Sequence, residues 1–266
     1  MPVAVASVLA SVKVLWPQGL NTSLYLDLNS FARQTAWAHG FMHAYALWLG
    51  LALMAAVFLA AYVLAWWRRD VHGAALLFVG GVGTLVALGL NQLVGHAAGE
   101  LRPYDTYRHA LVLVAKAHDF AFPSDHATVA GALFVSVLLV LRRGGARAPG
   151  SAVGPSAASA SRPRVAGSVA VLAVAAAVAC LLLLFARVYV GAHYPGDVVA
   201  GALLGGAVVL LVSAARPLAY RVADLVEQTP LGVLVRRPSS ELERGRDPDG
   251  RRRRSTGGEG DHPAGM

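Results

Sequence analysis

The sequence is poor in charge. Only 14% of its 266 residues are charged and 56% are hydrophobic, whereas a soluble domain carries about 25% charged residues. This deficit argues against a soluble globular protein and indicates that much of the chain lies in a lipid bilayer. The formal net charge is +8, but the arginines stand between and after apolar segments and no nucleic-acid recognition motif accompanies them. We therefore attribute them to membrane topology and not to nucleic-acid binding.

Cysteine is almost absent. Cys180 is the single cysteine, so no intrachain disulfide can form, and it lies inside an apolar segment where a thiol has little thiolate character. We expect no cysteine-based chemistry. The apolar N-terminal segment, residues 1–16, lacks a basic n-region and a cleavage site, so we do not expect it to be a signal peptide.

Long apolar segments are abundant. Five segments are candidate bilayer-spanning helices: residues 41–67, 73–95, 127–141, 165–186 and 198–215. The third is shorter than the others but can be extended back toward residue 121, and none alternates with the period of a strand. The sequence therefore predicts an all-α fold, a polytopic membrane helical bundle of about five transmembrane helices. Residues 1–40 form a predicted N-terminal interfacial segment, 41–215 a transmembrane core, and 216–266 a basic tail that is disordered from about residue 238.

Lysine and arginine are distributed unevenly between the predicted loops. Seventeen of the 23 lie in the turn after the first segment, in the loop 142–164 or after residue 215, and six lie on the opposite side. Because basic loops stay in the cytoplasm, we expect a multi-pass protein of the plasma membrane with an external N-terminus and a cytoplasmic C-terminus. Seven of the nine histidines fall on the outer side or at its edge, which places the candidate site there.

Three blocks of polar residues on that outer side carry the candidate chemistry. The first is Arg102-Pro103, the second runs over residues 123–126 and the third over residues 187–197. Together they contain the candidate site residues Arg102, Ser124, Asp125, His126, Arg187, His193 and Asp197. Taken singly, the second block is equally compatible with a helix N-cap and the third with a structural ion-pair cluster. Their occurrence together, in this order and on one side, favours a functional site.

Each residue type suits phosphoryl transfer. Arginines such as Arg102 and Arg187 grip phosphoryl oxygens in bidentate fashion, and a hydroxyl such as that of Ser124 adds a donor. A histidine can act as nucleophile when a carboxylate orients it, and His193 precedes Asp197 by four residues. A second histidine, His126, can protonate the departing oxygen.

The order Arg-Pro, Pro-Ser-x-His and Arg-x5-His-x3-Asp resembles the three-part signature of the type 2 phosphatidic acid phosphatase family, over residues 73–215. That family includes lipid phosphate phosphatases, bacterial acid phosphatases and vanadium haloperoxidases. The resemblance implies that His193 forms a phosphohistidine and is oriented by Asp197, and that His126 is the general acid. It implies that Arg102, Ser124 and Arg187 bind phosphate, to which Asp125 is adjacent, and that the phosphatase needs no metal or other cofactor.

The chain departs from that signature at two positions. Gly95 stands where the family has a lysine, for which Lys116, Arg108 or His96 are the candidate replacements, and Asp125 stands where it has glycine. Pro-Ser-Asp-His is similar to the form found in the bacitracin-resistance type of undecaprenyl-diphosphatase. The resemblance therefore implies a membrane lipid as partner and undecaprenyl diphosphate as substrate.

Other functions stay open at this point. The alternatives are a phosphatase of phosphatidate or phosphatidylglycerophosphate, a non-catalytic lipid-binding or lipid-transporting relative, and a vanadate-dependent haloperoxidase. We interpret Asn91 and Gln92, late in the second apolar segment, as interhelical hydrogen-bonding residues and not as ligands.

Overall fold

The computed structural model describes residues 18–145 and 162–228. Within these ranges the chain forms helices and connecting loops and no strand, so the predicted all-α class is confirmed. The N-terminal residues 1–16, most of the loop 142–164 and the tail from residue 238, for which we made predictions, lie outside the described residues.

Four stretches are long and apolar enough to cross a bilayer: Ala36–Trp67, Val71–Thr106, Ala170–Tyr189 and Pro195–Val226. The first contains the 3-10 turn η1 (Ala36–Ala38), α3 (His39–Ala44), the π-helical segment η2 (Tyr45–Leu49) and α4 (Gly50–Trp67). The second and fourth contain α5 (Val71–Ala98) and α9 (Pro195–Val212), and the third is the C-terminal part of α8 (Arg162–Tyr189). These helices make the chain a multi-pass membrane protein, in agreement with the sequence.

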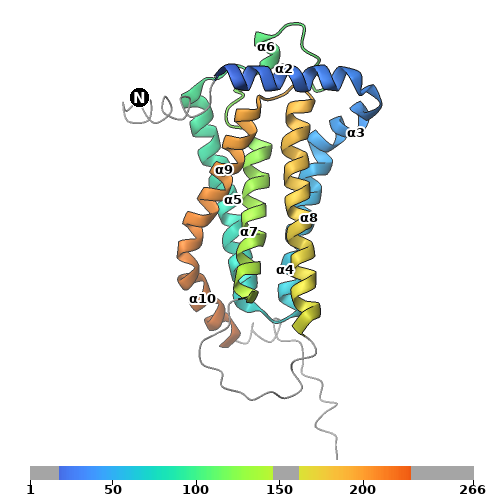
Figure 1. Ribbon diagram of the computed structural model, residues 1–266. Helices are drawn as coiled ribbons and strands as arrows, with labels where there is room; N and C mark the ends of the chain where they lie inside the picture. The colour runs from blue at the N-terminus through green and yellow to red at the C-terminus, as the bar shows by residue number, and fades with distance from the viewer. Residues whose placement is uncertain (1–17, 146–161, 229–266) are drawn as a thin grey trace, which may run out of the picture. The chain divides into compact units, whose positions relative to one another are not determined.

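The predicted fifth span is α7 (Asp125–Gly145), and it differs from the other four. The helix has 21 residues, but among the described residues its apolar part is Asp125–Val140, shorter than the four stretches above. α7 lies among the other helices and packs against α4, α5, α8 and α9 (Figure 1). Because neighbouring helices cover it, α7 needs less apolar surface than a helix that faces lipid on several sides.

Small residues bring α7 and α9 close together. Gly205 of α9 lies so near the backbone of α7 that an added Cβ would overlap the carbonyl oxygen of Thr128, and Gly201 makes a similar approach to Ser124. Gly131 of α7 meets the backbone of Ala202 in the same way. Close backbone approach through small residues is the usual way in which helices pack in membranes, where lipid removes the hydrophobic driving force between them. The start of α7 is thereby fixed against the start of α9.

Helix α2 (Gln18–Gln34) lies across one end of the bundle (Figure 1). Its buried side includes two asparagines that bind backbone groups of other elements. Asn29 donates to the carbonyl oxygen of Leu111 at 2.8 Å and accepts from the amide of Leu111 at 3.0 Å, and Asn21 accepts from the amide of Gly196 at 2.8 Å. α2 therefore holds the loop before α7 and the first turn of α9 in place.

The region after residue 215 begins with a helix and not with an extended tail. The short turn η3 (Ser213–Ala215) connects α9 to the amphipathic α10 (Arg216–Gln228). Asp224 lies 3.1 Å from His72 at the start of α5, while Leu218, Val222 and Leu225 are exposed. The apolar residues recur at helical spacing on one face, which explains why this segment is helical although its composition is more polar than that of α9.

Candidate functional site

A cavity of about 210 Å³ lies at the end of the bundle where α7 begins and α8 ends. Its walls include five of the seven candidate residues: Arg102, Asp125, His126, Arg187 and His193. Ser124 and Asp197 do not line it but are buried beside it, at 0% and 1% exposure. The three sequence blocks therefore meet in space, and the cavity is large enough for a phosphate group.

A tight turn between α8 and α9 returns His193 towards Arg187. Gly191 in this turn has a φ of +79°, a left-handed conformation that favours glycine. A side chain there would also overlap the carbonyl oxygen of Leu111, whose loop packs against the turn. The glycine therefore lets the chain reverse within a few residues, so that two members of the third block face each other.

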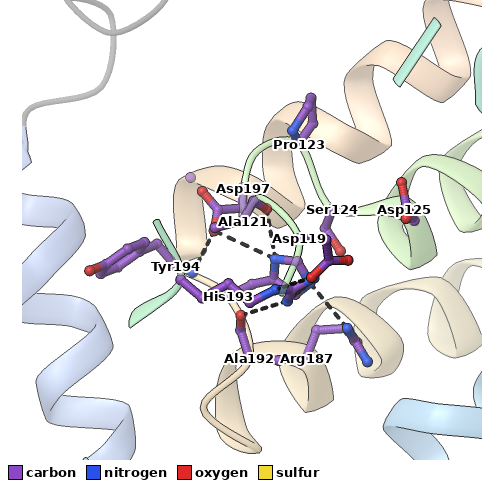
Figure 2. Close-up of polar contacts among 12 residues, drawn as sticks. Asp119, Ala121, Pro123, Ser124, Asp125, Arg187, Ala192, His193, Tyr194 and Asp197 are labelled. Carbon is purple, nitrogen blue, oxygen red and sulfur yellow. Dashed lines mark hydrogen bonds and ion pairs between the residues drawn. The ribbon is translucent and has the colours of Figure 1, made fainter. Parts of the chain in front are cut away.

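The imidazole of His193 is buried and receives both arginines on the same nitrogen. Arg102 Nη1 lies 3.2 Å and Arg187 Nη2 lies 3.1 Å from Nε2 of His193. Figure 2 shows the ring between Arg187 on one side and Ala121 and Asp197 on the other. Because a guanidinium can only donate hydrogen bonds, Nε2 accepts and carries no proton.

The other ring nitrogen carries the proton. His193 Nδ1 lies 2.8 Å from the carbonyl oxygen of Ala121, which can only accept, and 3.6 Å from Asp197 Oδ2. Asp197 Oδ2 itself accepts from the amide of Tyr194 at 2.8 Å and caps the first turn of α9. The sequence predicted Asp197 as the group that orients His193; in the structure the nearer acceptor is a backbone carbonyl, and Asp197 stands behind it.

Burial lowers the pKa of His193 well below its usual value, and the positive charges of Arg187 and Arg102 lower it further. Both causes disfavour the imidazolium, because a third positive charge beside the two arginines would be neither solvated nor paired. The ring is therefore neutral at physiological pH, and the lone pair of Nε2 accepts the hydrogen bonds of the two arginines. A neutral imidazole whose Nε2 carries no proton is the form that can attack phosphorus once the arginines bind the phosphoryl oxygens instead.

The two arginines differ in how their charge is balanced. Arg102 donates through Nε to Asp119 at 2.8 Å and through Nη1 to the carbonyl oxygen of Ala192 at 3.1 Å. Arg187 is 6% exposed, and its other hydrogen bond goes to the carbonyl oxygen of Ala46 at 3.3 Å. Among the described residues no carboxylate forms an ion pair with Arg187. Burying a cation without a counter-charge costs solvation free energy, and an anion bound beside Arg187 would offset that cost.

Two buried donors near His193, one of them on Arg187 itself, also lack a hydrogen-bond partner. The hydroxyl of Ser124 and Nε of Arg187 are buried without a hydrogen bond to any described group. Ser124 immediately precedes α7, yet its hydroxyl does not cap that helix. Buried polar atoms are almost always paired, so unpaired donors beside a cavity of positive charge favour a bound anion with several acceptor oxygens.

Asp125 is held by the second predicted span. The amides of Asn91 and Gln92 on α5 both donate to its Oδ1. The interpretation of these two residues as interhelical hydrogen-bonding groups is confirmed. Sequence reasoning could not name their partner, because the register between α5 and α7 depends on packing.

None of the three residues considered as replacements for the signature lysine lines the cavity. Lys116 lies over the ring of Tyr104 at 5.6 Å, His96 contacts the backbone of Gln92, and Arg108 is likewise absent from the cavity wall. At Gly95 itself an added Cβ would lie 3.3 Å from the carbonyl oxygen of Phe122, a tight contact with the loop before α7.

Backbone groups and one apolar segment complete the site, and no sequence motif revealed them. Ala121 and Ala46 contribute carbonyl oxygens, and Leu47 of η2 lines the cavity next to His126. η2 is π-helical, a conformation that leaves some backbone groups out of the α-helical hydrogen-bond ladder and often occurs at functional sites. Apolar sequence alone carries no signal for such a segment.

The fold and site define the class of this protein: a multi-pass membrane helical bundle with a buried, positively charged histidine–arginine site at one end. Comparison with known protein families identifies the family within this class. The sequence profile of the PAP2 superfamily matches residues 73–221, more than half of the chain, and the chain belongs to this superfamily.

Two relatives illustrate the likeness. The chain is 26% identical over 121 residues to a protein named undecaprenyl-diphosphatase from Sulfolobus acidocaldarius, and the match spans 46% of each chain, so less than half of that relative's length. It also resembles the crystal structure of a transmembrane PAP2-type phosphatidylglycerolphosphate phosphatase from Bacillus subtilis, with a TM-score of 0.52 and 20% identity. This second match covers 80% of this chain and 94% of the other and supports the fold.

Proposed function

We propose that this protein is a membrane lipid phosphatase that hydrolyses a lipid phosphate or diphosphate through a phosphohistidine on His193. The observation that supports this most directly is the pairing of a neutral, buried imidazole with two arginines on its Nε2, one of which has no carboxylate partner. An incoming phosphoryl group supplies the missing negative charge and meets the nucleophile at the same point.

The reaction has two steps. The lone pair of His193 Nε2 attacks phosphorus, the bond from phosphorus to the leaving oxygen breaks, and His126, which lines the cavity, relays a proton from water to that oxygen. Water then attacks the phosphohistidine, His126 takes back a proton, and the phosphorus–nitrogen bond breaks to release inorganic phosphate. Arg102 and Arg187, which donate to Nε2 of His193, transfer their hydrogen bonds to the phosphoryl oxygens, and Ser124 adds a donor.

Undecaprenyl diphosphate is the favoured substrate. This choice rests on the Pro-Ser-Asp-His block and on the name of the Sulfolobus relative. A phosphatidate or phosphatidylglycerophosphate is the second candidate. We further propose that catalysis needs no metal and that the cavity faces the extracytoplasmic side, because the described end of the bundle that carries it has fewer lysines and arginines in its loops.

The test is phosphate release by purified protein from undecaprenyl diphosphate, phosphatidate and phosphatidylglycerophosphate in the presence of a chelator. His193→Ala should lower the rate by at least about a thousandfold, because the nucleophile is lost. His109→Ala is the matched control, since His109 is an exposed histidine that does not line the cavity.

Trapping distinguishes an enzyme from a lipid-binding relative. Acid-labile, base-stable phosphate should appear on the native protein during turnover and not on His193→Ala. Lipid binding without phosphate release in any arm would favour the non-catalytic alternative, and full activity of His193→Ala would contradict the nucleophile assignment.

A further inference from the structure

Asp125 is an acid in a site built for anions, and α5 fixes its orientation. Gln92 Nε2 donates to Asp125 Oδ1 at 2.7 Å, and Asn91 Nδ2 donates to the same oxygen. Two donors on one oxygen set the angle of the carboxylate. The side chain of Asp125 is therefore held in one orientation in the cavity wall.

Asn91 cannot turn away from this contact. It is 2% exposed, its Oδ1 accepts from the hydroxyl of Thr128 at 2.8 Å, and its Nδ2 also donates to the carbonyl oxygen of Pro123 at 3.1 Å. The hydroxyl of Thr128 has a single proton and also lies 3.0 Å from the carbonyl oxygen of Ser124, so it does not fix the amide by itself. The carbonyl oxygen of Pro123 and the carboxylate of Asp125, which only accept, set the orientation of the Asn91 amide. Its nitrogen must then face Pro123 and Asp125. These hydrogen bonds keep Nδ2 of Asn91 directed at the carboxylate of Asp125.

The second carboxylate oxygen remains available. Among the described residues, Asp125 Oδ2 has no hydrogen-bond donor, whereas the carboxylate lines the cavity. The titratable and charged groups that line the cavity with it are His126, Arg187, Arg102, His193 and Asp119. The arginines on this wall attract a phosphate, and the carboxylate of Asp125 opposes one unless the ligand offers a proton to share.

The cavity is also less positive than the family signature implies. The carboxylate of Asp125 is added where the signature has glycine, and no lysine among the described residues lines the cavity in place of the one missing at Gly95. Both changes act in the same direction. They disfavour a fully deprotonated phosphate and favour a ligand that carries a hydrogen-bond donor of its own.

We propose that Asp125 is a specificity-determining residue whose Oδ2 accepts a hydrogen bond from a hydroxyl at the phosphate end of the substrate. This inference rests on the proposed function. The hydroxyl has two possible sources: the P–OH of a singly protonated terminal phosphate, or an alcohol of the head group such as that of glycerol. A phosphate monoester loses its last proton near pH 6, so the first source disappears at alkaline pH and the second does not.

The experiment compares native protein with Asp125→Asn on three substrates, at pH 5.5 and pH 8. Undecaprenyl diphosphate and phosphatidate carry no alcohol beside the phosphate, and phosphatidylglycerophosphate carries one. For a P–OH donor, the variant should lose about ten- to a hundredfold in kcat/KM at pH 5.5 on all three substrates. At pH 8 it should equal or exceed the native protein, because a repulsive charge has been removed.

For an alcohol donor the pattern is different. The loss should then be confined to phosphatidylglycerophosphate and be similar at both pH values. Asp105→Asn is the matched control, because Asp105 is an exposed acid near Arg102 in sequence that does not line the cavity. Its kcat/KM should equal that of the native protein on all three substrates at both pH values. Gln92→Ala, which removes one of the two donors to Oδ1, should show the same pattern as Asp125→Asn with a loss of about two- to threefold.

Two results would overturn the inference. One is an Asp125→Asn enzyme with unchanged kcat/KM, and the other is a uniform loss across substrates and pH, the mark of a purely structural role. Gln92→Ala keeps the carboxylate and gives the same answer if Asp125→Asn fails to fold. If the native protein releases phosphate and Asp125→Asn shows either of these results, only the role of Asp125 is contradicted. Native protein that releases none contradicts the proposed function as well.

Discussion

The carbonyl oxygen of Ala121 accepts the Nδ1 proton of His193 at 2.8 Å, and it does so in front of Asp197, whose nearest oxygen is 3.6 Å away. The backbone, and not the carboxylate, therefore selects the tautomer of the proposed nucleophile. In hydrolases where an aspartate alone fixes the tautomer, exchanging it for asparagine costs about ten-thousandfold in kcat. The arrangement here removes the main cause of so large a loss.

We accordingly expect Asp197→Asn to lower kcat by about ten- to a hundredfold, through the loss of a negative charge near the histidine. Asparagine can still accept from the amide of Tyr194 and preserve the first turn of α9. His193→Ala, measured in parallel, should lose at least about a thousandfold. Equal losses in the two variants would show that Asp197 controls the tautomer after all.

Arg187→Gln should separate activity from stability. Its guanidinium is buried without a carboxylate partner among the described residues, so replacing it with a neutral side chain removes a desolvation cost. We expect kcat/KM to fall by about a hundred- to a thousandfold while the thermal midpoint of the ligand-free protein stays constant or rises. The exposed Arg108→Gln is the control. A large drop in the midpoint would mean that Arg187 mainly holds Ala46 and η2 in place.

The low pKa of His193 makes the folded protein sensitive to acid. The unfolded chain binds a proton at this histidine near pH 6.5, and the folded chain does so only well below that value. The contribution of His193 to stability is therefore complete above about pH 6.5 and decreases by up to about 1.4 kcal/mol per pH unit below it. His193→Gln should lose less of its thermal midpoint between pH 7.5 and pH 5.5 than the native protein. Identical losses would indicate that His193 is already charged in the fold.

The contact of α7 with α9 should tolerate no added carbon. Gly205→Ala places a methyl group against the carbonyl oxygen of Thr128, so the helices must separate, and we expect a destabilisation of at least about 2 kcal/mol. Gly89→Ala is the matched control, because Gly89 on α5 is exposed and has nothing within 4 Å of the added carbon. Thermal midpoints from size-exclusion chromatography in detergent measure both, and equal midpoints would contradict the packing argument.

Much of the fold was predictable from composition. The apolar segments 41–67, 73–95, 165–186 and 198–215 correspond to the four long helical stretches, because a bilayer selects for continuous apolar length. What the pattern could not show is the environment of each helix. The segment 127–141 was apolar like the others, though shorter, and only the structure shows that α7 lies among its neighbours.

The candidate site was predictable as a set of side chains and not as an arrangement. Arginine, histidine and serine at fixed spacings point to phosphate chemistry through their side-chain groups. Ala121 and Ala46 act through carbonyl oxygens, which every residue possesses, so their sequence carries no signal. The unpaired hydroxyl of Ser124 and the lack of a carboxylate partner for Arg187 among the described residues also depend on how the helices are placed relative to one another.

The enclosure of α7 by four other helices has a consequence for how the chain is made. A short apolar segment that begins with Asp125 and His126 partitions poorly into lipid by itself, since each charged residue within a span opposes insertion. We therefore expect this helix to enter the membrane more readily once α4 and α5 are in place. Because α8 and α9 then pack against it, we expect integration of the chain into the bilayer to be coupled to assembly of the candidate site.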